Sequence, residues 1–213
     1  MSCFTGEKWA VWGAARSGIA AANLLVDLGA RVILSDNRAI SDLDLDHLDP
    51  RVRIRGGENI LSDADFLVPS PGIPPRHTQL QAACDAGTTL VSEIELAAMV
   101  SEAPIVAITG TDGKSTTTEM IGSVVRAAGR RAVVAGNIGD PLSNRVRDVD
   151  ASGVVVAEVS AFQLWSCGYF SPQVSIVTNI AEDHAEYFEG NVEAYIDAKA
   201  RVLSDMKPGS VAV

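Results

Sequence analysis

The sequence predicts an α/β protein with two consecutive units, each a parallel β-sheet with helices on its faces. Strand-length apolar runs alternate with helical patterns along most of the 213 residues, and this alternation is typical of parallel sheets. Two glycine-rich turns, at residues 13–18 and 109–113, each connect an expected strand to an expected helix. We therefore expect a Rossmann-like domain first and a phosphate-binding-loop (P-loop) domain second.

The first unit is predicted from five short apolar runs and two helical patterns. The expected strands are residues 8–12, 31–35, 52–54, 66–69 and 88–91, and the expected helices are residues 19–28 and 77–86. Ser92 and Glu95 have the spacing of a capping box, which predicts a further helix to about residue 100. We place the boundary near residues 92–103, which assigns residues 1–92 to the first domain and 93–213 to the second.

The second unit shows the same alternation around the second glycine-rich turn. The expected strands are residues 105–108, 132–135, 153–159, 174–180 and 210–213, and the expected helices are residues 118–128, a part of 141–147, and 192–203. In the helix at 118–128, the spacing of Met120, Ile121, Val124 and Val125 predicts the buried face. No element follows the last strand, so this α/β domain is expected to be truncated.

Composition excludes several classes of function. A formal net charge of −10 argues against affinity for nucleic acid or an anionic membrane surface, and no apolar run approaches the ~20 residues of a membrane span. Cys3, Cys84 and Cys167 are odd in number and irregularly spaced, which favours reduced thiols. With no signal peptide visible, we expect a cytoplasmic protein.

Residues 109–117, Thr-Gly-Thr-Asp-Gly-Lys-Ser-Thr-Thr, are the strongest functional signal. In such a loop the backbone amides surround phosphate oxygens, Lys114 neutralises charge and the Ser115 hydroxyl holds magnesium. The strict motif has glycine where this chain has Ile108, so the loop is a shortened form. The alternative is a glycine-rich turn without a ligand. The residues expected to bind ATP are Gly110, Thr111, Asp112, Gly113, Lys114, Ser115 and Thr116.

Two charged residues interrupt apolar patterns. Glu158 lies in a strand that is apolar on both faces, where a carboxylate is costly unless it binds magnesium or forms an ion pair. Lys199 falls on the helical face of Val192, Tyr195, Ile196 and Leu203. Burial lowers the pKa of a lysine, and a neutral amine can take up carbon dioxide as a carbamate, a possible magnesium ligand. The alternative is a lysine whose ammonium group reaches solvent at the edge of this face.

The remaining candidates follow expected strands. Residues 13–18 form a dinucleotide fingerprint in which Ala15 replaces the middle glycine, and Asp36 ends the next strand. NAD, another nucleotide phosphate and a turn without ligand all remain possible there. Residues 70–74 (Ser-Pro-Gly-Ile-Pro) and 136–139 (Gly-Asn-Ile-Gly) are expected turns that can meet a ligand or serve only as loops. His184, after the strand at 174–180, is either a ligand or an ordinary helix-start histidine.

The shortened loop resembles the ATP-binding loop of the Mur ligases, which folylpolyglutamate synthetases share. Residues 70–74, 136–139 and 160–164 (Ser-Ala-Phe-Gln-Leu, with Ala161 for a second serine) resemble the branch of the family that adds D-glutamate. The resemblance covers the chain from about residue 6 to its end. It implies ATP-driven amide formation through an acyl phosphate in peptidoglycan precursor synthesis. The implied partners are ATP, D-glutamate, UDP-N-acetylmuramoyl-L-alanine and two Mg²⁺ ions.

The resemblance also implies roles for individual residues. The implied catalytic residues are Lys114, His184 and Lys199; those at the metals are Ser115, Glu158, His184 and a carbamylated Lys199; those at the substrate are Ser17, Asp36, Asn37, Arg38, Ser70, Gly72, Asn137, Ser160 and His184. Family members are longer, so the isolated chain is expected to be inactive. The alternatives are another Mur ligase, a folylpolyglutamate synthetase-like ligase or a non-catalytic nucleotide-binding module. An NAD-dependent oxidoreductase leaves the Gly113-Lys114-Ser115 sequence unexplained.

Overall fold

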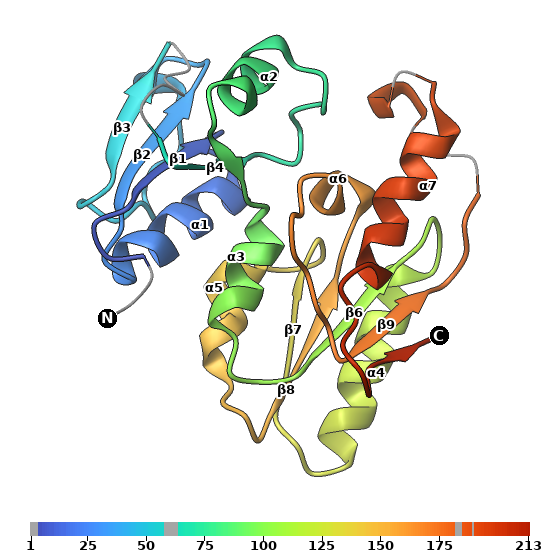
Figure 1. The fold of residues 1–213 in the computed structure, drawn as a ribbon. Coiled ribbons are helices and arrows are strands. Elements are labelled where there is room, and N and C mark those ends of the chain that lie inside the picture. Colours follow the sequence, from blue (N-terminus) through green and yellow to red (C-terminus); the bar gives the residue numbers. More distant parts are fainter. Residues whose placement is uncertain (1–3, 58–63, 182–184, 189) are drawn as a thin grey trace. The chain divides into compact units, whose positions relative to one another are not determined.

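The computed structural model describes residues 4–57, 64–181, 185–188 and 190–213. The chain divides into two compact units, Met1–Glu93 and Ile94–Val213. Each unit contains its own five-stranded sheet, and every strand pair recorded in these sheets is parallel (Figure 1). The prediction of two α/β units with parallel sheets is confirmed.

The first unit is a Rossmann-like sheet with the strand order β3-β2-β1-β4-β5. Its elements are β1 (Lys8–Trp12), α1 (Arg16–Asp27), β2 (Arg31–Asp36), a short 3₁₀ helix (Ile40–Asp42), β3 (Arg53–Gly56), β4 (Phe66–Pro69), α2 (Thr78–Asp85) and β5 (Thr89–Leu90). The chain extends the sheet from β1 in one direction and then returns to place β4 on the other side of β1. Ligands of such sheets bind at the carboxyl ends of the strands where this reversal occurs.

Helix α1 packs on β1 and β2 (Figure 1). It covers the face of Val11, whose Cγ1 would be 3.5 Å from a Cβ at Gly18, and of its strand partner Leu34. It begins at Arg16, three residues earlier than predicted, so the glycine-rich turn is shorter than the motif. Gly18 lies inside the helix, and a Cβ there would be only 1.8 Å from the carbonyl oxygen of Gly13. This glycine therefore permits the close approach of the helix to the end of β1.

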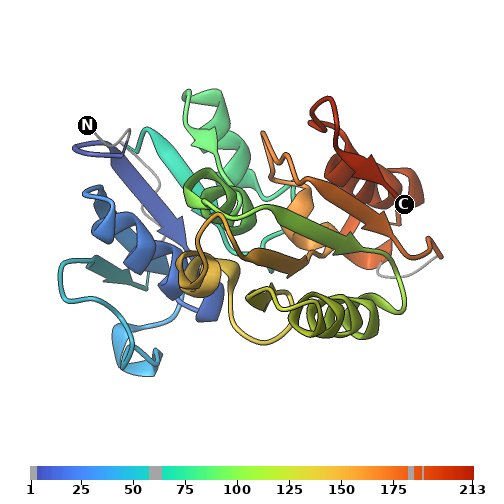
Figure 2. The same cartoon turned by 90° about the horizontal axis from the view of Figure 1, so that it is seen from below.

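The second unit has the strand order β10-β9-β6-β8-β7, with β6 at the centre. Its elements are α3 (Glu93–Val100), β6 (Ile105–Thr109), α4 (Lys114–Ala127), β7 (Ala132–Gly136), α5 (Leu142–Arg145), β8 (Val154–Glu158), α6 (Ala161–Leu164), β9 (Val174–Val177), α7 (Val192–Ala200) and β10 (Val211–Ala212), with 3₁₀ helices at Val146–Asp148, Ala185–Phe188 and Arg201–Leu203. Helix α4 packs across β6, β7 and β8 (Figure 2). The five residues of β8 are all buried, as the apolar run predicted.

The predicted buried face of α4 is wrong in part. Met120 and Val124 are 63% and 67% exposed, whereas Thr118 and Gly122 are the buried residues of the helix. A Cβ at Gly122 would be 2.5 Å from Cγ2 of Val134 in β7. The helix thus approaches the sheet through its small residues, which a count of apolar side chains does not detect.

Strand β9 and helix α7 are both shorter than predicted. β9 ends at Val177 instead of residue 180, because Thr178 and Asn179 turn away to contact the loop after β6. Helix α7 ends at Ala200 and continues as a 3₁₀ turn.

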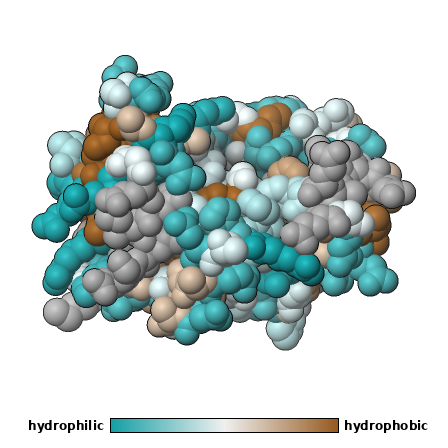
Figure 3. All heavy atoms as spheres, turned by 90° about the horizontal axis from the view of Figure 1, so that it is seen from above, coloured by the Kyte–Doolittle hydropathy of each residue, from teal (hydrophilic) through white to brown (hydrophobic). Residues whose placement is uncertain are grey.

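No described helix combines the length and apolar character needed to cross a membrane. On the face shown in Figure 3, hydrophilic residues predominate and apolar residues form separate patches.

Candidate functional site

The glycine-rich loop of the second unit connects the central strand β6 to α4. Gly113 has φ of 77° and is the N-cap of α4, a conformation that favours glycine. Glycine has no side chain to cap the first turn, so the amides of Lys114, Ser115 and Thr116 begin a helix without a side-chain cap. Such a helix end attracts anions through its amides and its dipole.

Lys114 begins α4 and folds back over the loop. Its Nζ donates a hydrogen bond to the carbonyl oxygen of Thr111 at 2.7 Å, and Thr118 Oγ1 donates to the Lys114 carbonyl at 2.8 Å. The side chains of Ser115 and Thr116 are exposed at the same end of the helix. One cation, two hydroxyls and the helix terminus are therefore grouped at one end of α4.

Two residues just beyond β9 hold this loop in place. Thr178 Oγ1 donates to the carbonyl oxygen of Asp112 at 2.6 Å, and Asn179 Nδ2 donates to the same oxygen at 3.0 Å. The Asp112 amide donates in return to Asn179 Oδ1 at 3.0 Å. Thr178 and Asn179 were not among the predicted site residues. Their signal was a polar pair at the end of an apolar strand.

Helix α7 contacts the loop through two side chains one turn apart. Lys199 is 2% exposed; its Nζ donates to the carbonyl oxygen of Gly110 and lies 4.5 Å from the centroid of the Tyr195 ring. The Tyr195 hydroxyl lies 3.2 Å from Thr111 Oγ1. Sequence reasoning placed Tyr195 on the face of Lys199 but gave it no role at the loop.

The face of α7 that is buried differs from the predicted one. Tyr195, Ala198 and Lys199 are its buried residues, whereas Ile196 and Leu203 are 37% and 38% exposed. The expectation that Lys199 is buried agrees with the structure, but the apolar face used to predict it is wrong in part. The contacts of Lys199 and Tyr195 with the loop determine how α7 is rotated about its own axis, and therefore which face of the helix is buried.

Glu158 ends β8 beside the loop and is 1% exposed. Strand register pairs it with Ile108 of β6 on one side and Gly136 of β7 on the other. Its Oε1 accepts a hydrogen bond from Asn137 Nδ2 at 2.7 Å, whereas its buried Oε2 has no hydrogen-bond partner among the residues that the structure describes. A buried carboxylate oxygen left in this state is suited to a cation.

The polar groups beside the loop are better suited to magnesium than to a metal ion that is coordinated by protein side chains alone. Within the described ranges, no group of three or more His, Cys, Asp or Glu residues could hold a metal ion. Magnesium commonly takes one or two carboxylates and completes its shell with phosphate oxygens and water, which is the chemistry that Glu158 and the Ser115 hydroxyl can supply. His184, the predicted second-metal ligand, lies outside the described residues.

Two predicted substrate residues of this unit lie at the ends of neighbouring strands. Asn137 follows β7, and its amide donates to the Glu158 carbonyl at 2.8 Å. Ser160 is the N-cap of α6, and both its amide and its Oγ lie 3.0 Å from Gln163 Oε1. Both residues thus occupy the carboxyl edge of the sheet, the edge that carries the phosphate loop.

In the first unit, Asp36 organises the turn after β1. Its Oδ2 accepts from the Ala14 amide at 2.8 Å, and its two oxygens accept from Nε and Nη2 of Arg38, each at 2.9 Å. Chiefly because of the Arg38 hydrogen bonds, the pKa of Asp36 is held well below its usual range. Asn37 and Arg38 are exposed beside it. The carboxylate is thus engaged by the protein itself.

The turn after β1 lies directly against the segment after β4. The Ser70 amide donates to the Trp12 carbonyl at 2.7 Å, and a Cβ at Gly13 would be 2.7 Å from Ser70 Cβ. Ser17 lies in the first turn of α1, whose N-cap is Ala15 without a capping side chain, and Gly72 is exposed. This is the point of strand reversal, where such sheets bind ligands.

Comparison with protein families agrees with both units. Residues 7–92 match the Mur ligase MurD-like N-terminal domain, and residues 108–213 match the Mur ligase middle domain. This chain belongs to the Mur ligase family. The part of the resemblance that named the family is therefore confirmed.

Relatives within the Mur ligase family share substantial identity. The UDP-N-acetylmuramoylalanine--D-glutamate ligase of Salinibacter ruber is 44% identical over 95% of this chain and 46% of its own length. That of Trichlorobacter lovleyi is 42% identical over 97% and 48%. The chain thus spans about half the length of these curated relatives. A solved ligase from Neisseria meningitides, described as UDP-N-acetylmuramate:L-alanyl-gamma-D-glutamyl-meso-diaminopimelate ligase, shares the fold with a TM-score of 0.60 at 16% identity over 97% of this chain and 71% of that one.

Proposed function

We propose that this chain supplies the uridine-substrate site and part of the ATP site of a cytoplasmic ligase that joins D-glutamate to UDP-N-acetylmuramoyl-L-alanine. One observation carries the ATP-dependent half of this proposal. The buried, half-satisfied carboxylate of Glu158 lies at the end of the strand next to the loop that bears Lys114. A site for a metal-bound nucleoside triphosphate needs an anion cradle and a hard cation ligand side by side, and relatives named for this ligation support the choice of substrate.

The first unit binds the uridine diphosphate part of the substrate in this proposal. The uncapped first turn of α1 with Ser17 accepts the diphosphate, and Ser70 and Gly72 border it. Asn37 and Arg38 lie beside the uracil. Asp36 acts as a positioning residue, because its carboxylate holds Arg38 and the Ala14 amide.

NAD is a poorer occupant of this turn. Ala15 replaces the glycine that lets backbone approach a pyrophosphate most closely. In dinucleotide sites the acid at the end of the second strand accepts ribose hydroxyls. Here the Asp36 carboxylate already accepts from Arg38 and Ala14.

The second unit activates the substrate carboxylate. Residues 110–116 surround the ATP phosphates, and Lys114 neutralises charge on the phosphoryl group as it passes to the carboxylate. The acyl phosphate is then attacked by the amino group of D-glutamate, an amide bond forms, and phosphate leaves. Asn137 and Ser160 orient the substrate at this edge of the sheet.

Ser115 and Glu158 would hold one magnesium ion, and His184 with Lys199 would hold the second. Bound magnesium offsets the repulsion between the anions that react. A carbamylated Lys199 supplies a carboxylate for this purpose, and a carbamate nitrogen keeps one N–H. It can therefore retain the hydrogen bond to the Gly110 carbonyl that Nζ makes here.

Calorimetric titration of this chain with UDP-N-acetylmuramoyl-L-alanine, Mg-ATP and NAD tests the proposal. We expect Lys114→Ala to weaken Mg-ATP binding by about tenfold or more, since a charge-assisted phosphate contact is lost, with binding of the uridine substrate unchanged. Lys207→Ala, in the same unit, is the matched control and should change neither. Saturable NAD binding without a response to the uridine substrate would overturn the assignment of the first unit.

A further inference from the structure

A cavity of about 570 Å³ lies at the amino-terminal edge of the first sheet, the opposite end of the strands from the Gly13–Gly18 turn. Its walls come from the start of β1, the end of α1, the start of β2 and the segment that leads into β3. Ala10 and Ile33 contribute apolar surface, and Lys8, Arg31, Arg51 and Arg53 contribute positive charge. Neither proposed nucleotide site uses these residues.

The strand register explains why the sheet is notched here. Lys8 of β1 pairs with Arg31 of β2, but β3 begins only at Arg53, which pairs with Ile33. Strand β2 therefore begins two residues before the β3 ladder does. The chain before β3 forms a turn in which the Val52 amide donates to the Asp49 carbonyl at 3.0 Å.

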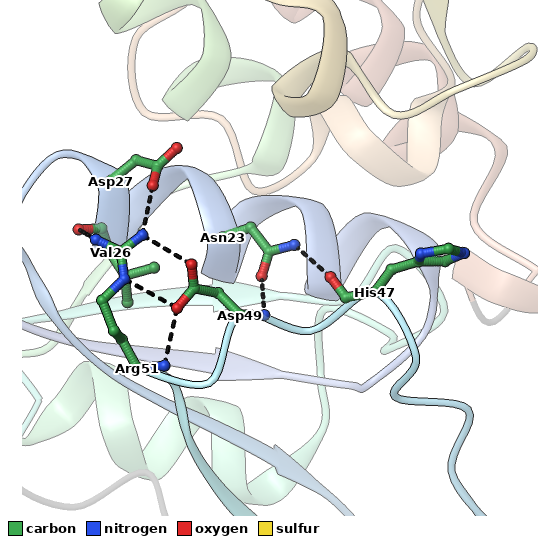
Figure 4. Close-up of polar contacts among 6 residues, drawn as sticks. All are labelled: Asn23, Val26, Asp27, His47, Asp49 and Arg51. Carbon is green, nitrogen blue, oxygen red and sulfur yellow. Dashed lines mark hydrogen bonds and ion pairs between the residues drawn. The ribbon is translucent and has the colours of Figure 1, made fainter.

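Arg51 is fixed in the wall of the cavity by a polar network (Figure 4). Its Nη2 lies 2.6 Å from Asp27 Oδ1 and 2.7 Å from Asp49 Oδ2, and the Arg51 hydrogen bonds lower the pKa of Asp49 to about 2. Asn23 of α1 accepts from the Asp49 amide at 2.9 Å and donates to the His47 carbonyl at 2.7 Å. The segment before β3 is thereby tied to α1, so this wall exists without a ligand.

The other three cations are not neutralised in this way. Lys8, Arg31 and Arg53 are exposed, and their side chains have no ion-pair partner among the residues that the structure describes. Because side chains alternate along strands and Lys8 pairs with Arg31, all three project from the same face of the sheet. In a chain with a net charge of −10, three cations on one face give the cavity a positive potential, which the Asp65 carboxylate, an acceptor of the Lys8 amide at 3.0 Å, offsets in part.

We propose that this cavity binds a small organic anion, with a phosphate or carboxylate head group held by Arg31, Arg53 and Lys8 and an apolar body against Ala10 and Ile33, which lie on the same face of the sheet as these cations. The volume falls within the ~300–1,000 Å³ of small-molecule sites. Guanidinium groups recognise such head groups through paired hydrogen bonds.

The test is calorimetric titration of the whole chain with phenyl phosphate, with octyl phosphate and phenol in parallel. We expect saturable binding of phenyl phosphate and none of phenol, because the head group supplies the attraction. Arg31→Ala combined with Arg53→Ala should weaken binding by about tenfold or more. Arg55→Ala is the matched control, because Arg55 is exposed on the same face of β3 but does not line the cavity; it should change binding by less than about twofold.

Two further measurements separate this site from the nucleotide sites. Lys114→Ala and saturating uridine substrate should both leave phenyl phosphate binding unchanged. Tighter binding of octyl phosphate would assign the site to a lipid-like anion, and tighter binding of phenyl phosphate to a flat soluble one. The proposal is overturned if phenyl phosphate does not saturate, if Arg55→Ala weakens it as much as the double variant, or if Lys114→Ala abolishes it. Should the double variant unfold, the affinity of Arg31→Lys for phenyl phosphate takes its place, because this variant keeps the charge but loses the paired donors.

Discussion

At the scale of single residues, two buried charges of opposite sign lie next to the phosphate loop in different circumstances. Lys199 has a carbonyl acceptor and an aromatic face, which together compensate for lost hydration. Glu158 has one oxygen bonded to Asn137 and the other without a partner among the described residues. The lysine therefore stabilises the loop as it stands, whereas the carboxylate is suited to a ligand that arrives with the nucleotide.

Substitution of Lys199 distinguishes a carbamate from a plain cation. In a complete ligase that carries this sequence, we expect Lys199→Ala to lower activity by about 100-fold, the upper range for loss of a metal-site residue. Formate or acetate should restore part of it by filling the vacated ligand position. A carbamate carbonyl signal from ¹³C-bicarbonate, absent in Lys199→Ala, would report the modification independently.

Lys199→Arg is the control for charge. Arginine keeps its positive charge and cannot be carbamylated, so this variant should be inactive if the carbamate is required. An active arginine variant, with no rescue of the alanine variant by small carboxylates, would mean that Lys199 acts only as a cation on the loop.

Asp36 predicts a pH-dependent contribution to the stability of the first unit. Its pKa is lowered in the folded protein, mainly by Arg38. Its stabilisation is therefore present above the unfolded pKa of about 3.9 and is lost as the pH falls below that value. We expect Asp36→Asn to reduce the free energy of unfolding by about 1–3 kcal/mol at neutral pH. In urea unfolding experiments, the difference in free energy of unfolding between wild type and Asp36→Asn should become smaller near pH 3. A difference that becomes larger as the pH falls would contradict this prediction.

At the scale of elements, short backbone approaches decide how strands and loops meet at the site. In the Gly136-Asn137-Ile138-Gly139 turn, the first glycine has φ of 112°, and a Cβ there would be 2.3 Å from the Glu158 carbonyl oxygen. Gly139 also has positive φ, of 64°, but a Cβ there would meet nothing within 4 Å. Only the first glycine therefore holds β7 and β8 at the distance that joins Asn137 to Glu158.

Alanine substitution at these two glycines separates packing from backbone strain. Gly136→Ala should lower the free energy of unfolding by about 2–5 kcal/mol, since it combines a steric clash with a strained φ. Gly139→Ala should cost only about 1 kcal/mol, because strain alone is added. Thermal unfolding of both variants measures the difference, and equal costs would show that contact with β8 is not what requires Gly136.

At the scale of the molecule, each unit has its own sheet and buried core. Leu34 and Leu67 are fully buried in the first unit, and Val155 and Ala157 in the second. The boundary between the compact units falls at Glu93 and Ile94, at the start of α3. A unit that contains its own core can fold alone.

We expect residues 1–93, expressed alone, to fold cooperatively and to retain saturable binding of the uridine substrate, weaker than in the whole chain because the contacts of Asn137 and Ser160 are absent. Leu34→Ala should destabilise this fragment by about 2–5 kcal/mol through the cavity it leaves. The same substitution in the whole chain should leave Mg-ATP binding unchanged under conditions that keep the second unit folded. Circular dichroism and calorimetry provide the measurements; a fragment that is unfolded at 25 °C would show that the first unit depends on the second.

The sequence by itself determined the fold class, the strand–turn–helix context of Lys114 and the unusual position of Glu158. These follow from local periodicity and from glycine placement, which each segment carries without its neighbours. Only the tertiary structure decided the buried face of α4, where Gly122 rather than Met120 meets the sheet. It also decided the partners of the phosphate loop, because Thr178 and Tyr195 lie far along the chain from Thr111 and Asp112.

The basic cavity of the first unit is also a feature that only the tertiary structure decided. Arg31 and Arg53 are separated in sequence and carry no motif, and they meet because β3 joins the sheet two residues late. Strand register depends on packing and turn geometry across the whole sheet. A local pattern can therefore place a residue on a strand, but only the assembled sheet decides which charges stand together.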